Sequence, residues 1–420
     1  MSDILRDIEG INFKGFPPLL WDRIFKREAI MYECGMKRNL FRQCIKLIIY
    51  PFIHKAKTFS YRPSSNSKIL FFQDIDREIC KKQFENVTKL LISADVLISD
   101  EKYIIQCHFF QGFRTIMFIG SWIKELMKYH LRFSQKVDIL VLLLLIYNFH
   151  QSIRFLNIEK FHLFVSFYDS LLYDAYLTEL FKYYNIPTAT LQHGAFSAWR
   201  ENELIHSGVE LRTFHSDYLL CWNQFTVSEA IKSGINPSSL VVTGVIGYVG
   251  EKYRKCISPK NKYFGVVIGH PSFHQENIAL IQAANLLARN TGYKYYLKLH
   301  PNYKEDAFSV YVDNEFYIGN IKKGILMIDY AEMVEFSIVY GSSVFIELIY
   351  LGHDVIRYSD GGIHDKYRDI HIGKIFSRID DIVKVYKRNL GKDYSNDLFD
   401  MMCTIRDVDK SYKEFFMKFE

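Results

Sequence analysis

The sequence predicts an α/β protein of two domains, each built on a parallel sheet, that face each other across a cleft. Short apolar runs bounded by turn residues alternate with helical patterns from Ser67 onward, which is typical of repeated βα units. A polar and basic stretch, residues 251–262, interrupts the alternation and has the composition of a connector. The chain has 420 residues, of which 49% are hydrophobic, enough for two ordinary cores.

Residues 1–65 are expected to form a basic amphipathic segment ahead of the first domain. From Lys37 to Arg62 every charged residue is Lys or Arg, and large apolar residues are interleaved among them. This combination suits the surface of an anionic bilayer, and the alternative is an ordinary amphipathic helix that packs on the first domain. Because the first seven residues lack the apolar core of a signal peptide, we expect a cytoplasmic protein, free or peripheral at the inner face of the cell membrane.

The first domain is predicted to span residues 66–250. The run from Ile139 to Tyr147 is too short for a membrane span and predicts a buried helix or strand. Asp169 and Ser170 can cap a helix that ends before Pro187, which completes a βαβ unit. The expected strands are Lys68–Phe72, Ala94–Ile98, Phe161–Tyr168, Thr188–Leu191, Tyr218–Trp222 and Leu240–Ile246.

The second domain is predicted to span residues 263–385. A helical pattern follows its first strand, and residues 386–420 are expected to form C-terminal helices that pack back on the first domain. The expected strands are Tyr263–Ile268, Tyr295–Leu299, Ile338–Tyr340 and Val355–Tyr358.

Charge and cysteine usage limit the partners. The net charge of +6 is too small for a dedicated nucleic-acid binder and is adequate for phosphorylated small molecules or an anionic membrane. The seven cysteines are scattered and never spaced as C-x-x-C, so we expect a reducing compartment, no disulfide framework and no zinc site. The sequence has neither a P-loop nor a dinucleotide-binding fingerprint.

Ligands bind at the carboxyl ends of strands in parallel sheets, so the residues that follow each apolar run are the candidates for a site. Gln192-His193-Gly194 ends the first βαβ unit, and Gly194 lets the backbone approach a ligand closely. His193 is the candidate base for an acceptor hydroxyl, with a loop histidine bonded to neighbouring backbone as the alternative. Asp169, at the neighbouring strand end, is the second candidate.

Two His-Pro pairs follow strands in the second domain. His300-Pro301 lies two residues after Lys298, and Gly269-His270-Pro271 follows the preceding strand. A donor held on such a rigid turn can bind a diphosphate and stabilise it as a leaving group. The alternative is that X-Pro simply begins many loops.

Ser342 and Ser343 precede a short helix that carries Glu347. Hydroxyls and backbone N–H groups at a helix start can bind a nucleotide phosphate, whereas an ordinary N-cap is the alternative. These pieces occur in an order that resembles bacterial GT-B glycosyltransferases of cell-surface polysaccharide synthesis, from about residue 160 to 360. The motifs are Thr190–Gly194, Asp217–Trp222, Val241–Gly244, Lys298–Pro301 and Gly341–Glu347.

The resemblance is strongest to the group of CDP-glycerol glycerophosphotransferase-like enzymes and bacterial sialyl- and polysialyltransferases, which share a His-Pro and a Ser-Ser/Thr motif. It implies two Rossmann-like domains, a nucleotide-activated donor on the second, and no metal or cofactor. By this resemblance Glu347 would meet the donor's ribose or sugar. The acidic D/E-D/E-G motif of the sialyltransferases is missing from the first domain, which argues against sialyl transfer.

The expected function is therefore transfer of a sugar or polyol phosphate to a surface glycan or lipid-linked acceptor. The alternatives are a GT-B-like nucleotide-sugar epimerase and a non-catalytic nucleotide-sugar-binding assembly protein. Donor contacts are expected from Gly269, His270, Lys298, His300, Pro301, Ser342, Ser343 and Glu347, and acceptor-side contacts from Gln192, His193 and Gly194.

Overall fold

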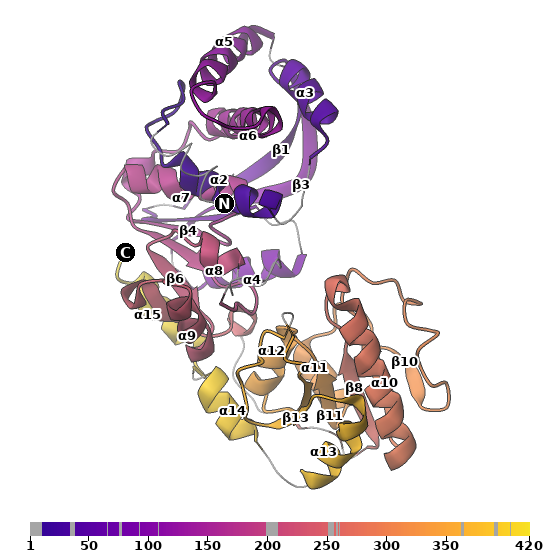
Figure 1. Cartoon of the computed structure of the whole chain (residues 1–420). Coiled ribbons are helices and arrows are strands. Elements are labelled where there is room, and N and C mark those ends of the chain that lie inside the picture. The colour runs from indigo at the N-terminus through magenta and orange to yellow at the C-terminus, as the bar shows by residue number, and fades with distance from the viewer. Residues whose placement is uncertain are drawn as a thin grey trace.

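The chain forms two α/β domains, one above the other in Figure 1. The structure is a computed structural model. It describes residues 11–33, 38–64, 66–74, 78–91, 93–107, 109–198, 209–250, 256–257, 259, 261–362, 365–389, 394–403 and 405–420.

The first sheet has seven strands in the order β1-β3-β2-β4-β5-β6-β7. Its pairs are parallel except β1 with β3, which are antiparallel. The strands β2, β4 and β5 are buried along their whole length, because helices cover both faces of the sheet. The strands are β1 (Ile53–Arg62), β2 (Ile69–Gln73), β3 (Asp95–Cys107), β4 (Leu163–Ser166), β5 (Thr188–Leu191), β6 (Tyr218–Cys221) and β7 (Leu240–Val242).

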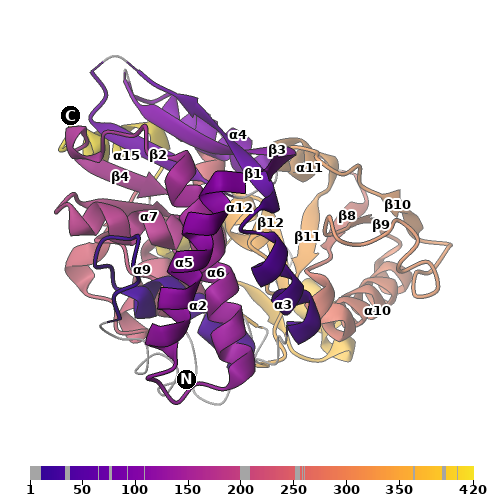
Figure 2. The ribbon, with the colours of Figure 1, turned by 90° about the horizontal axis from the view of Figure 1, so that it is seen from above.

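The helices of the first domain fall into two groups. Those that alternate with strands cover the sheet, while α3, α5 and α6 lie together at the end of the domain remote from the second domain (Figures 1 and 2). The bounds are α2 (Trp21–Glu33), α3 (Leu40–Ile49), α4 (Glu78–Thr88), α5 (Phe109–Leu126), α6 (Phe133–Ser152), α7 (Leu172–Tyr183), α8 (Val209–Thr213) and α9 (Gln224–Lys232).

Helix α6 contains the apolar run from Ile139 to Tyr147 and is a buried helix. It is the one helix within the described ranges that is long and apolar enough to cross a membrane by length and composition. More than half of its most apolar window is buried, and residues such as Leu143, Leu144 and Ile146 belong to the core of the first domain. Its place in that core accounts for its composition.

The second sheet has six parallel strands in the order β10-β9-β8-β11-β12-β13. The chain runs outward from β8 to β10, returns to β11 beside β8, and runs outward again, so the order of the strands reverses between β8 and β11. The bounds are β8 (Tyr263–Val267), β9 (Lys294–Lys298), β10 (Tyr317–Asn320), β11 (Phe336–Val339), β12 (Asp354–Tyr358), β13 (Lys374–Phe376), α10 (His274–Thr291), α11 (Met327–Met333), α12 (Val344–Tyr350) and α13 (Ile382–Arg388).

The expectation of a separate N-terminal segment, residues 1–65, is wrong for the part that the structure describes. Strand β1 pairs with β3 from Ile53↔Cys107 to Arg62↔Val96, so it is an edge strand of the first sheet. Trp21 at the start of α2 is fully buried in the same core as α6. Residues 11–33 and 38–62 therefore belong to the first domain, because the strand needs the sheet for its hydrogen bonds.

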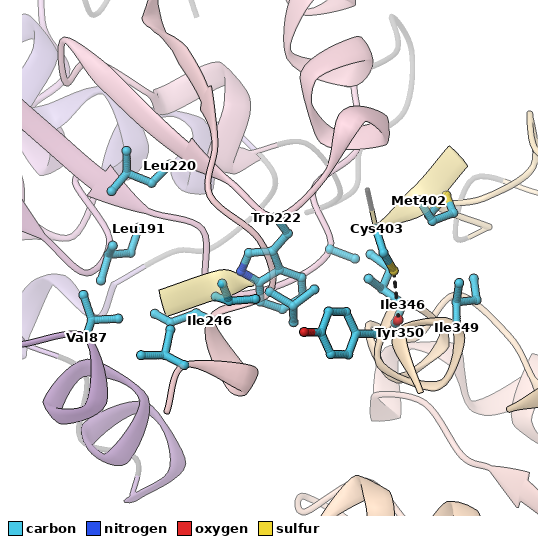
Figure 3. Packing of buried hydrophobic residues seen from close by; sticks show 14 of the residues in the cluster. Val87, Leu191, Leu220, Trp222, Ile246, Ile346, Ile349, Tyr350, Met402 and Cys403 are labelled. Atoms are coloured by element: carbon cyan, nitrogen blue, oxygen red, sulfur yellow. Dashed lines mark hydrogen bonds between the residues drawn. The ribbon is translucent and has the colours of Figure 1, made fainter. Parts of the chain in front are cut away.

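The two domains are joined by a continuous apolar core (Figure 3). In the junction the ring of Tyr248 stacks on that of Tyr350, with 4.0 Å between the ring centroids. The Tyr248 hydroxyl donates a hydrogen bond to the Glu347 carbonyl at 3.1 Å. The residues drawn come from both sides: Val87, Leu191, Leu220, Trp222 and Ile246 from the first domain, and Ile346, Ile349, Tyr350, Met402 and Cys403 from α12 and the C-terminal segment.

The C-terminal helices α14 (Ser395–Met402) and α15 (Val408–Phe416) return from the second domain to the first. Phe415 and Phe419 pack against Tyr218, and Phe416 packs against Phe71. The backbone N–H of Gly250 donates to Asp409 at 2.7 Å. The end of the chain thus stabilises the first domain.

Candidate functional site

The point in the second sheet where the strand order reverses brings together two of the predicted motifs. Gly269-His270 follows β8, and Gly341-Ser342 follows β11, the strand beside it. In doubly wound sheets the crevice at this point is where ligands bind. The topology therefore places the two motifs at one edge, with Lys298 and His300 at the end of the neighbouring strand β9.

The two His-Pro histidines lie against each other, with ring centroids 5.0 Å apart and planes at 82°. Each Nδ1 accepts a hydrogen bond from its own loop at 3.2 Å: His270 from the Ser272 N–H and His300 from the Asn302 N–H. A neutral imidazole whose Nδ1 accepts carries its proton on Nε2. His300 is thus oriented as an Nε2–H donor, the form that suits a phosphate oxygen, whereas Nε2 of His270 lies 3.4 Å from the amide nitrogen of Asn302.

Packing against Phe273 and a hydrogen bond to Asn277 fix the position of Gly269. An added Cβ would lie 3.1 Å from the Phe273 ring, and the Gly269 N–H donates to Asn277 Oδ1 at 2.8 Å. Its N–H is therefore used within the fold, and its contribution to the site is to hold the turn that presents His270. Pro301 is exposed beside His300.

The turn before α12 separates the roles of the two serines. Gly341 has a φ of +52°, in the left-handed region, and Ser342 Oγ accepts from the Val344 N–H at 3.3 Å. Ser343 stands at the N-cap position without a side-chain cap hydrogen bond. The N-cap interpretation thus accounts for the Ser342 hydroxyl and leaves the Ser343 hydroxyl unexplained.

Glu347 and Lys298 form the charged part of this edge. Both side chains are partly buried. Burial raises the pKa of Glu347 to about 7, with Lys298 acting against that shift, and burial lowers the pKa of Lys298. An acid with a pKa near 7 inside a crevice is typical of a functional group that changes its charge near neutral pH.

On the first domain the predicted residue Gln192 is buried and used by the fold. Its Oε1 accepts from the Trp222 N–H at 2.6 Å, its carbonyl accepts from Trp222 Nε1 at 2.7 Å, and its Nε2 donates to the Gly194 carbonyl at 2.7 Å. These bonds fix the loop after β5 and orient Trp222. The contacts give Gln192 a positioning role, so its predicted contact with an acceptor has no support in this geometry.

His193 is partly buried and lies among three aromatic rings. The centroid of its ring is 4.2 Å from that of Tyr168, 5.3 Å from that of Phe196 and 5.7 Å from that of Phe167. The next residue, Gly194, has open space where a Cβ would be. The imidazole is thus held by packing beside a backbone that a ligand can approach.

Asp169 is buried and engaged by a neighbouring loop. Its Oδ2 accepts from the N–H groups of His215 and Ser216 at 3.0 and 2.9 Å, and from the Ser216 hydroxyl at 2.8 Å. An oxygen that already accepts three hydrogen bonds has little room left to accept a proton from a bound hydroxyl. These contacts favour a structural role, and the role of Asp169 as a base stays a prediction.

A turn of the second domain that the sequence analysis missed connects the two sides. Lys366 Nζ donates to the Ala195 carbonyl at 2.9 Å, two residues after His193. The neighbouring Tyr367 hydroxyl donates to the Ser342 carbonyl at 3.0 Å. The sequence carries no signal for this turn, because Lys366 lies several residues beyond the end of β12, whereas the predicted motifs follow their strands directly. The His193 loop and the Ser342 turn therefore contact adjacent residues of one turn.

Similarity to solved structures shows the fold. UDP-GlcNAc 2-epimerase from Neisseria meningitidis, solved with bound UDP-GlcNAc, matches with a TM-score of 0.52 and 11% identity, over 83% of this chain and 98% of that chain. A putative UDP-N-acetylglucosamine 2-epimerase from Listeria monocytogenes gives 0.52 and 11%, over 84% and 98%. The apo lipopolysaccharide outer core galactosyltransferase WaaB gives 0.49 and 13%, over 83% and 99%.

No protein-family model and no curated protein matches the sequence. The structural matches are with enzymes of the GT-B fold, and the chain has that fold: two α/β domains whose sheets are mostly parallel. Within the part of the chain that the structure describes, no group of three or more His, Cys, Asp or Glu side chains is arranged to hold a metal ion.

Proposed function

We propose that the protein transfers a sugar, or a polyol phosphate, from a nucleotide-activated donor to a cell-surface glycan or lipid-linked acceptor. One observation carries the proposal: residues 366 and 367 contact both the His193 loop and the Ser342 turn. Transfer requires an acceptor base and a leaving-group site on facing sides of one cleft, and this turn links the two.

The donor is proposed to bind at the edge of the second sheet. The Nε2–H group of His300 and the Ser343 hydroxyl are donors for phosphate oxygens, His270 lies against His300 at the same edge, and Lys298 adds a cation. Glu347, when ionised, accepts from the hydroxyls of a ribose or sugar. These groups would stabilise the charge on the departing nucleotide, which is the main electrostatic task of such a site. The resemblance to the glycerophosphotransferase-like group supports this assignment.

The acceptor is proposed to bind on the first domain, with His193 as the base. A neutral imidazole is suited to remove a hydroxyl proton at neutral pH. Gly194 leaves space for the acceptor beside it. Lys366 holds the same loop at Ala195, so the position of the base is coupled to the donor domain.

Contact with an anionic membrane is proposed through α3. Its burial is reversed with respect to an ordinary surface helix: Phe41 and Ile48 are 75% and 72% exposed, whereas Gln43 is the residue of α3 that is buried. Helix α5 carries Met117, 73% exposed, at the same end of the molecule (Figure 2). Lys37, the first cation of the expected segment, lies outside the described residues.

The epimerase alternative uses the same donor site and differs in its need for an acceptor. It predicts inversion or hydrolysis of the nucleotide sugar alone, with no role for the outward apolar face of α3. The binding-protein alternative predicts nucleotide affinity without turnover. The reversed burial of α3 favours an acceptor at a membrane.

The test begins with thermal shifts of the full chain with CDP, CMP, UDP and GDP, because a ligand that binds the folded state raises its stability. The corresponding nucleotide sugars are then incubated with the protein, with and without membrane extract. Transfer that requires the extract supports the proposal, whereas conversion of the donor without any acceptor supports the epimerase.

Vesicle sedimentation tests the membrane contact. Phe41→Ser with Ile48→Ser should abolish binding to phosphatidylglycerol vesicles at low salt. The matched control is Val310→Ser, because Val310 is 82% exposed on the second domain. Equal vesicle binding by both variants would show that α3 does not mediate it.

A further inference from the structure

The side of α3 opposite its exposed apolar face lines a cavity of about 430 Å³ in the first domain. Four helices form the cavity. Helix α2 contributes Glu28, and α7 contributes Leu172. The other lining residues belong to α6, to α3 and to the two residues just before α3. A volume of this size is within the usual range for ligand pockets of roughly 300–1,000 Å³. The other lining residues are Arg38, Asn39, Arg42, Gln43, Lys46, Val141, Leu142 and Leu145.

One wall of the cavity is cationic, and carboxylates neutralise only part of its positive charge. Arg38 is paired with Glu28. Burial first, and then Arg38 and Arg42, lower the pKa of Lys46, while Asp138 acts against that shift. Among the described residues Arg42 makes no ion pair with a carboxylate. Three cations that repel one another around one cavity indicate an anionic ligand.

The lining of the cavity also contains a buried polar atom. Gln43 is 3% exposed, lines the cavity, and has a side-chain hydrogen bond with Asp138. Its Oε1 is buried and has no hydrogen-bond partner within the described ranges. A buried acceptor without a partner is unfavourable, so a ligand group that donates to it, such as a hydroxyl beside the phosphate, would be stabilised there.

The opposite wall is apolar and belongs to α6 and α7. Val141 and Leu142 of α6 and Leu172 of α7 line the cavity. A free inorganic anion would make no favourable contact with this apolar wall. An amphiphile has a charged end and an alkyl chain, so it can contact both walls. The two walls match a phosphate joined to a hydrocarbon chain.

A chain of contacts links the cavity to the proposed acceptor site. Glu28 is paired with Arg27 at 3.5 Å, and the Arg27 guanidinium lies 5.8 Å from the centroid of the Tyr168 ring. Tyr168 in turn lies against His193, at 4.2 Å between ring centroids. Contacts thus lead from Glu28, in the lining of the cavity, to the proposed base through Arg27 and Tyr168.

We infer that this cavity binds the phosphate-bearing end of a lipid-linked acceptor, with the phosphate on Arg38, Arg42 and Lys46 and the first carbons of the chain on the α6 wall. The inference rests on the proposed function and deepens it by naming the acceptor class. It explains why Arg42 and Lys46 line the cavity while Phe41 and Ile48 of the same helix are exposed.

The test uses n-decyl phosphate as the probe, below its micellar concentration, with titration calorimetry on the full chain. Wild type should bind it more tightly than inorganic phosphate or the neutral n-decyl glucoside. Arg42→Gln and Lys46→Gln should each weaken binding by about 5- to 20-fold, the loss of one charge-assisted contact. Lys410→Gln removes the same charge from an exposed site on α15 and should leave binding unchanged.

Lys46→Gln also separates binding from folding. Because Lys46 is desolvated beside two arginines, its replacement should leave the melting temperature unchanged or raise it while affinity falls. A loss of stability with unchanged affinity would overturn the inference and make Lys46 structural. Equal affinity for inorganic phosphate, or for the glucoside, would overturn it as well.

Two outcomes keep the inference apart from the proposed function. Decyl phosphate binding that depends on Arg42, in a protein that transfers nothing, would support the cavity and reject the transfer. Transfer to an acceptor without a phosphate, at a rate that Arg42→Gln leaves unchanged, would support the transfer and reject the cavity. Phe41→Ser with Ile48→Ser should weaken vesicle binding and leave decyl phosphate binding intact, which distinguishes a soluble amphiphile from a bilayer lipid.

Discussion

The strand ends of the two domains use their polar side chains differently. In the first domain Asp169 and Gln192 are 2% and 0% exposed, and their oxygens accept hydrogen bonds from neighbouring loops. In the second domain Glu347 is partly buried, and no hydrogen bond to its carboxylate is found within the described ranges, while Ser343 makes no cap bond. The position of a side chain at a strand end makes it a candidate for ligand binding. Whether it is available to a ligand depends on the hydrogen bonds that it already makes within the protein.

His193 is the exception in the first domain, and its replacement should have the largest effect. His193→Ala should lower turnover by about 10²–10⁴-fold, the usual contribution of a general base, because the acceptor hydroxyl loses its proton acceptor. Nucleotide affinity should stay within about twofold, since the nucleotide is bound on the other domain. Steady-state transfer rates and calorimetry with the nucleotide measure both.

A parallel loss of nucleotide affinity in His193→Ala would instead make His193 a donor ligand. Near-normal turnover would show that His193 is not the base, and Asp169 would then be the remaining candidate. Phe196→Leu is the matched control, because it alters the packing around the imidazole and keeps the imidazole itself.

Asp169→Ala should act on folding rather than chemistry. The substitution removes the acceptor of three hydrogen bonds from His215 and Ser216 and leaves two buried N–H groups without it. The free energy of unfolding should fall by about 2–4 kcal/mol, measured by urea denaturation. A stable variant that has lost turnover by more than 100-fold would contradict this and identify Asp169 as the base.

The Ser342 turn should show the opposite behaviour. Ser342→Ala with Ser343→Ala should weaken nucleotide binding by about 1–3 kcal/mol, because hydrogen bonds to a phosphate are lost. The hydrogen bond from the Tyr367 hydroxyl to the Ser342 carbonyl remains in this variant. Binding is measured by calorimetry, with the exposed Ser309→Ala as control. Unchanged affinity in the folded double variant would leave both serines as elements of the helix start.

The fold was predictable where strands lie inside a sheet. The expected runs Thr188–Leu191 and Tyr263–Ile268 correspond to β5 and β8, because central strands of a parallel sheet are buried on both faces and read as continuous apolar stretches. The three strands that the analysis missed, β1, β10 and β13, are edge strands. These edge strands lack a continuous apolar run of four or more residues, as in Lys374-Ile375-Phe376, whereas the edge strand β7 lies within the mostly apolar run Leu240–Ile246 and was predicted.

The candidate site was predictable in position and less so in role. The topology brings Gly269-His270 and Gly341-Ser342 to neighbouring strand ends, as the pattern of strands indicated. Neither the clamp between Gln192 and Trp222 nor the bond from Lys366 to Ala195 has a sequence signal, because each joins residues about 30 or more positions apart. Burial of Gln43 in a helix that exposes Phe41 is likewise a property of packing.

The smallest effect, and the sharpest test of the contrast between the domains, concerns Glu347. Its pKa rises from an ordinary 4.5 to about 7 on folding, chiefly through burial, so the folded state binds its proton more tightly than the unfolded state. A carboxyl of this kind lowers stability as the pH rises from about 4.5 to 7, and the cost is complete above that window. The groups near it are Lys298, which opposes the shift, and the hydroxyls of Tyr248 and Tyr367.

Glu347→Gln should therefore gain about 1–2 kcal/mol of stability relative to wild type between pH 5 and pH 8, after allowance for partial exposure and for Lys298. In wild type, nucleotide affinity should increase as the pH rises through 7, because the ionised carboxylate accepts from two hydroxyls of the ligand, and in the variant this dependence should disappear. Urea denaturation and calorimetry at the two pH values measure the two effects. Stability curves that run parallel from pH 5 to 8 would show that Glu347 is solvated like a surface acid, and the contrast between the domains would then rest on Ser343 alone.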